Sequence, residues 1–132
     1  MIRTRIQTLE HIQAQFEAGK LGAQNTYGGC VYESPDKTTN CAVGCLLSAE
    51  QMAAINGANA QHQNLSTLDS IFVKHELPTL QQTTGFNHDE LYNIQVGHDA
   101  WAKREAGADK EERGIAFMEH LNGLKAKEAV PA

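Results

Sequence analysis

The feature that most constrains the fold is an uninterrupted apolar stretch at residues 40–48, Asn-Cys-Ala-Val-Gly-Cys-Leu-Leu-Ser. Its seven central residues carry no charge, and it is the longest apolar run in the chain. A short helix that is apolar on every side belongs in a protein interior. We therefore predict a central core helix here, capped by Asn40. Cys41 and Cys45 would share one of its faces, and Gly44 would leave room for another backbone.

The remaining pattern predicts a mainly α fold in a single domain. A chain of 132 residues with 41% apolar residues can bury its own core. We expect a compact bundle of five or six short helices, with a small β-hairpin or extended insertion before the central helix, and α+β as the alternative. The domain would span residues 1–124, followed by a flexible tail at 125–132. Apolar spacing and capping signals predict further helices at about 4–18, 49–56, 66–75, 87–105 and 109–123.

For two of these helices, the spacing of apolar residues predicts which side chains face the core. The longest should bury Leu91, Ile94, His98 and Trp101, which recur at intervals of three and four. The last should bury Ile115, Met118 and Leu121, with Phe117 as a further candidate, and should end at Gly123. Residues 79–86 are expected to form only a connector.

The insertion at residues 20–39 contains the pattern Tyr-Gly-Gly-Cys-Val-Tyr and a turn signal at 34–37. We predict a short strand at about 30–33 within it. Tyr27 and Tyr32 flank the two glycines, and tyrosine is favoured at recognition surfaces. These two residues and Trp101 are the candidate binding residues, with coverage of the core as the competing role.

Composition excludes several classes of function. The net charge is −5 and neither half of the chain is basic, so we expect no direct nucleic-acid binding. No run approaches the roughly 20 apolar residues of a membrane span, and no signal peptide is recognised. An odd count of three cysteines fits free thiols in the cytoplasm. Phosphate-loop, dinucleotide, zinc-protease and serine-hydrolase motifs do not occur, and no cofactor is implied.

Cys41 is the one plausible nucleophile, because the first turn of a helix favours a thiolate. His98 would be its base, whereas Asp99, about 100° further round the helix, is poorly placed to orient that ring. Buried packing of both cysteines is the competing interpretation. A metal site formed by Cys30, Cys41, Cys45 and one histidine is a third interpretation. The second ligand pair of a structural zinc site does not occur, so we predict no metal.

The motifs at residues 41–46, Cys-Ala-Val-Gly-Cys-Leu, and 94–99, Ile-Gln-Val-Gly-His-Asp, resemble a pattern in small uncharacterised proteins of phages, prophages and bacteria. The likeness covers about residues 27–121. Such proteins often have Asn where this chain has His98, which implies a structural role for Cys41 and for the pair formed by His98 and Asp99. The family has no established activity to carry over.

These observations favour a small acidic binding or regulatory protein, plausibly encoded by a phage or mobile element. It would act by contact with a protein partner or a small ligand and is not expected to be an enzyme. The alternative function is a thiol-dependent hydrolase or transferase that uses Cys41 and His98.

Overall fold

The computed structural model describes residues 2–22, 31–104 and 107–129. The protein is mainly helical, with 65% of the described residues in helices, which confirms the predicted fold class. Its described part contains no β-strand, only two isolated bridges, both of which involve Asn40. The helices are α1 (Arg5–Glu17), the short 3-10 turn η1 (Gly44–Leu46), α2 (Ala49–Gly57), α3 (Leu65–Lys74), α4 (Leu80–Thr84), α5 (His88–Ala102) and α6 (Ala108–Ala129).

Reciprocal caps fix most of the helix starts. Ser48 and Gln51 form the predicted capping box of α2, and the same arrangement starts α1, α4 and α5. The predicted N-cap of α3 was wrong. Asn64, and not Ser66, caps this helix by accepting the N–H of Thr67. The prediction of a plain connector at 79–86 was also wrong. Thr79 there starts the five-residue helix α4.

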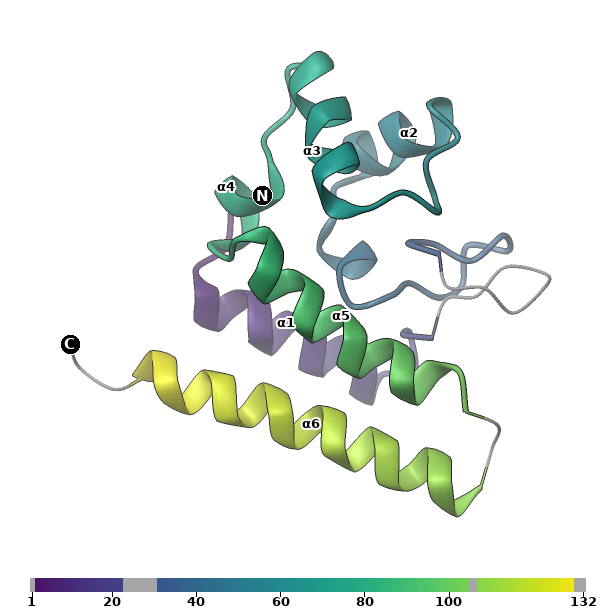
Figure 1. Ribbon diagram of the computed structural model, residues 1–132, viewed down its shortest axis with the longest axis vertical. Helices are drawn as coiled ribbons and strands as arrows, with labels where there is room; N and C mark the ends of the chain where they lie inside the picture. Colours follow the sequence, from purple (N-terminus) through teal and green to yellow (C-terminus); the bar gives the residue numbers. More distant parts are fainter. Residues whose placement is uncertain (1, 23–30, 105–106, 130–132) are drawn as a thin grey trace.

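The helices form two groups that meet at α5. Figure 1 shows α1, α5 and α6 in the lower half of the molecule, and α6 packs against both of the other two. The helices α2 and α3 pack together in the upper half, and α3 also contacts α5. The largest fully buried side chains are three phenylalanines, one in α3, one in the turn before α5 and one in α6: Phe72, Phe86 and Phe117.

The apolar segment 41–47 is buried as predicted, but it is not an α-helix. It makes a turn and then only the single turn of η1, and Leu47 is extended before α2 begins. A helix of this length is costly to nucleate, and the capping box at Ser48 starts a new helix immediately afterwards. Asn40 does not cap a helix, because its side-chain amide donates to the Tyr32 carbonyl.

Gly44 is where another backbone comes close, as its position predicted. A Cβ built on Gly44 would lie 1.9 Å from the carbonyl oxygen of Tyr32. That carbonyl accepts the backbone N–H of Cys41 at 3.3 Å and the Asn40 amide at 3.1 Å. The insertion is therefore seated directly on the apolar segment through backbone contact.

Residues 31–39 of the insertion form irregular chain with one tight turn. Asp36 stabilises this turn by accepting hydrogen bonds from Ser34 and Thr38. The hydrogen bonds from Ser34 and Thr38 lower the pKa of Asp36. The predicted strand at about 30–33 is replaced by a single bridging residue, Glu33, within the described residues. Tyr27 and Cys30 lie outside them.

The last helix departs from its prediction in two ways. Gly123 does not end α6, which continues to Ala129, so residues 125–129 are helix rather than tail. Ile115 was predicted to be buried but is 53% exposed, because Phe117 and Leu121 take the inward positions. Arg5 holds the far end of α6 to α1 through an ion pair of 2.7 Å with Glu128. Among the described helices, none is both long and apolar enough to cross a membrane.

Candidate functional sites

The thiol of Cys41 lies in a closed environment. Cys41 is 1% exposed, and its sulfur accepts the backbone N–H of Gly44 at 3.2 Å. Burial is the main cause that raises the pKa of this thiol far above its ordinary value. Burial likewise raises the pKa of Cys45 to about 12. Both sulfurs are therefore held as neutral thiols, which are poor nucleophiles.

His98 is fully buried and both of its ring nitrogens have partners. Nε2 accepts the N–H of Gly22 at 3.1 Å, so the ring proton belongs on Nδ1. Nδ1 then donates to Oδ1 of Asp99 at 3.0 Å. The expectation that Asp99 could not orient this ring was therefore wrong. The described residues contain no hydrogen bond between His98 and Cys41, so the structure favours the structural role for both.

Gln95 connects these groups and was not singled out by the sequence. Its amide oxygen accepts the N–H of Val43 at 3.0 Å, and its amide nitrogen donates to Asp99 at 2.7 Å. One glutamine on α5 thus ties the apolar segment to the pair formed by His98 and Asp99. A glutamine within a helix carries no sequence signal for such a role.

A small polar pocket opens beside this network. Its volume is about 160 Å³, whereas ligand pockets usually span roughly 300–1,000 Å³. Tyr32 is part of the wall but is only 9% exposed, and its hydroxyl donates to the Gln63 carbonyl at 2.7 Å. Burial raises the pKa of that hydroxyl. The pocket is lined by Val31, Tyr32, Cys41, Gln61, His62, Gln63, Gln95 and Asp99.

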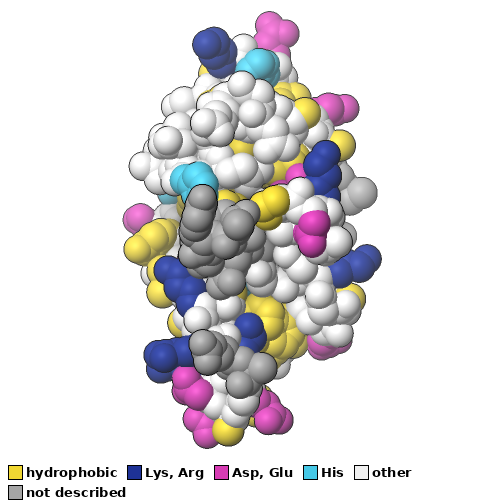
Figure 2. All heavy atoms as spheres, turned by 90° about the vertical axis from the view of Figure 1, so that its right-hand side faces the viewer, with side chains coloured by type: hydrophobic (Ala, Val, Ile, Leu, Met, Phe, Trp, Pro, Cys, Tyr) yellow, Lys and Arg dark blue, Asp and Glu magenta, His cyan; other side chains and the backbone are white. Residues whose placement is uncertain are grey.

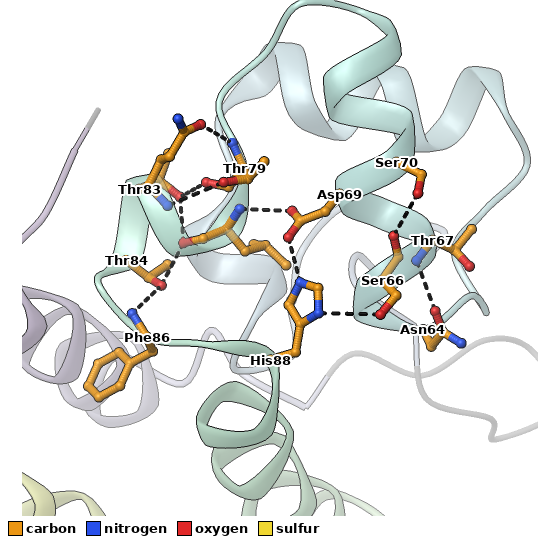
Figure 3. A network of polar contacts seen from close by, with 12 residues as sticks. Asn64, Ser66, Thr67, Asp69, Ser70, Thr79, Thr83, Thr84, Phe86 and His88 are labelled. Atoms are coloured by element: carbon orange, nitrogen blue, oxygen red, sulfur yellow. Dashed lines mark hydrogen bonds and ion pairs between the residues drawn. The ribbon is translucent and has the colours of Figure 1, made fainter.

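A second polar network joins α3, α4 and α5, and the sequence did not predict it. Figure 3 shows Asp69 between His88 and the start of α4. Asp69 accepts the N–H of Leu80 at 2.8 Å and contacts Nε2 of His88 at 2.5 Å. Nδ1 of His88 lies 3.3 Å from the hydroxyl of Ser66. This order of groups is that of a nucleophile, a base and an orienting acid.

The adjoining cavity does not support a catalytic role for this network. Its lining includes Asp69 and His88 but not Ser66. The hydroxyl that would attack a substrate and the space that would hold one therefore do not coincide. We interpret the network as a structural joint between three helices.

The third site is an apolar groove between α1, α5 and the first two thirds of α6. Its volume is about 570 Å³ and its lining is predominantly apolar. Phe16 and Trp101 form its floor, with ring centroids 4.8 Å apart. A hydrophobic patch appears in the lower part of Figure 2. Of the predicted binding residues, Trp101 belongs to this groove and Tyr32 to the polar pocket.

One wall of the groove is formed by a stripe of residues along one face of α6, together with the residue just before that helix. The residues recur at alternating intervals of three and one, which is the spacing of a single helical face. The stripe contains Ile115 at its centre, with charged residues toward both ends. Its members are Gly107, Lys110, Glu111, Gly114, Ile115, Met118, Glu119 and Asn122. We call this set the α6 stripe.

Gly114 allows the aromatic floor to close on α6. A Cβ at this position would lie 3.2 Å from both Phe16 and Trp101. Lys110 lies over the Trp101 ring, with its ammonium 4.8 Å from the ring centroid. The groove did not follow from the sequence, because the spacing of Ile115 predicted a core position for this residue.

Searches against protein-family models, curated proteins and solved structures find no match to this chain. The resemblance to small phage and bacterial proteins therefore stays a prediction. Within the described residues, no three His, Cys, Asp or Glu side chains are grouped so that they could hold a metal ion.

Proposed function

We propose that the protein is a small binding protein whose apolar groove accepts an α-helix of a protein partner. The α6 stripe is the observation that carries this proposal, because its spacing presents one helical face along about 22 Å of α6. Helix recognition commonly uses an apolar groove that receives residues at intervals of three and four. The groove is also within the size range of ligand sites, whereas the polar pocket is not.

The charges along the groove define the chemistry of the partner helix. Lys110 lies toward one end of the α6 stripe and Glu119 toward the other. A complementary helix carries an apolar residue at its centre, an acidic residue opposite Lys110 and a basic residue opposite Glu119. A cytoplasmic location and a phage or mobile-element origin belong to this proposal as sequence-based predictions.

Trp101 makes the proposal directly measurable, because it is the only tryptophan in the chain. We would titrate dilute protein with a tryptophan-free model helix that has a leucine stripe and complementary end charges. A scrambled peptide of the same composition is the control. We expect saturable changes in Trp101 fluorescence with the striped peptide only. Equal responses to both peptides, or no response to either, would reject the proposal.

Two protein variants sharpen this test. Ile115→Glu places a charge at the centre of the groove and should weaken peptide binding by about tenfold or more, since burial of an isoleucine side chain is lost. Val73→Glu makes the same kind of change on α3, where Val73 is 64% exposed and outside the groove lining. That control should bind the peptide like the unmodified protein.

A further inference from the structure

We infer that the helix received by this groove is α6 of a second copy of the chain, packed antiparallel. This inference rests on the proposed function and names its partner. The argument comes from the chemistry of the α6 stripe, which is complementary to itself when reversed. A two-fold dimer requires this property, because each position meets the corresponding position of the same surface.

The pairing follows from the residue numbers of the stripe. When two copies of α6 run antiparallel about the midpoint between Gly114 and Ile115, every stripe residue is level with another stripe residue. Lys110 is then level with Glu119 of the second copy, and the two-fold axis produces this pair of opposite charges twice. Glu111 is level with Met118, whose neutral side chain produces no charge repulsion.

The apolar centre also fits. Ile115 of one copy is level with Gly114 of the other, where it would meet the rings of Phe16 and Trp101, which pack closely against Gly114. This arrangement would cover Ile115, which is 53% exposed in the single chain. Apolar contact between Ile115 and these rings would replace contact of the isoleucine with water, which favours association.

The charge pairs give a test that separates this pairing from any other association. Lys110→Glu and Glu119→Lys each create two repulsive pairs, and we expect each to raise the dimer dissociation constant by about tenfold or more. The double variant restores opposite charges and should restore the dimer. Glu112→Lys, on α6 but outside the stripe, is the matched control and should change association little.

Mass would be measured by sedimentation equilibrium over a range of protein concentrations, and the inferred dimer predicts twice the monomer mass.

A disulfide test checks the register, because Ile115 lies next to its own counterpart across the two-fold axis. Ile115→Cys should form a cross-linked dimer under copper–phenanthroline oxidation faster than the unmodified protein, and Val73→Cys should not.

The outcomes distinguish the inference from the proposed function. A protein that stays monomeric but still binds the striped peptide at Trp101 overturns the inference and keeps the proposed function. A monomer that binds no peptide overturns both. A dimer that persists unchanged in Lys110→Glu, or a double variant that fails to recover association, shows that the second copy does not use this surface.

Discussion

Replacement of Gly44 by alanine should destabilise the protein more than any change of similar size at its surface. The new Cβ would lie 1.9 Å from the carbonyl oxygen of Tyr32, which is about 1.1 Å short of the 3.0 Å closest approach of real Cβ atoms. The obstacle is backbone and cannot rotate away. The segment that carries Tyr32 must therefore move off the apolar segment.

The cost can be worked out from what that movement breaks. Overpacking of a dense interior costs about 1–3 kcal/mol, and sometimes more. The Tyr32 carbonyl also loses two hydrogen-bond donors, the N–H of Cys41 and the amide of Asn40, each worth about 1 kcal/mol. We expect a loss of about 3–5 kcal/mol, a large part of the roughly 5–15 kcal/mol of a typical domain.

Urea unfolding followed by circular dichroism would measure this loss. Gly123→Ala is the matched control, because a Cβ there meets no atom within 4 Å. That change in the interior of α6 should stabilise the protein by about 0.5–1 kcal/mol. If the free energy of unfolding of Gly44→Ala lies within about 1 kcal/mol of that of the unmodified protein, well below the expected loss of about 3–5 kcal/mol, the seating of the insertion on Gly44 is refuted.

Three further predictions test the remaining sites. Native Cys41 should resist iodoacetamide at neutral pH and react only as the protein unfolds, since burial raises its pKa; rapid alkylation of the folded protein would revive the thiol-dependent alternative. Hydrogen bonding from Arg5 lowers the pKa of Glu90, so the stability that Glu90 contributes is complete above the ordinary glutamate pKa and is lost as the pH falls through the lowered one. Urea midpoints of Glu90→Gln should accordingly lie below those of the unmodified protein at neutral pH and converge with them in acid. Asp69→Ala leaves the N–H of Leu80 without its acceptor and should cost about 1–3 kcal/mol in the same urea assay, and a neutral effect would contradict the role of this network as a joint.

The sequence alone determined the features that depend on local chemistry. Capping boxes such as the one at Ser48 satisfy backbone groups within four residues, so a local pattern is enough to find them. The interior position of Cys41 and the buried place of His98 followed from apolar patterning in the same way. The mainly α fold class is the sum of such local signals.

Only the tertiary structure decided the features that depend on which faces meet. The N–H of Val43, at the start of the single turn η1, finds its acceptor in Gln95, far along the chain. Ile115 is exposed although its spacing suits a buried stripe, because α1 and α5 together cover only one side of α6. The groove exists for that reason. A pattern of residues along one helix specifies an apolar face, but the other helices of the fold determine whether that face is covered.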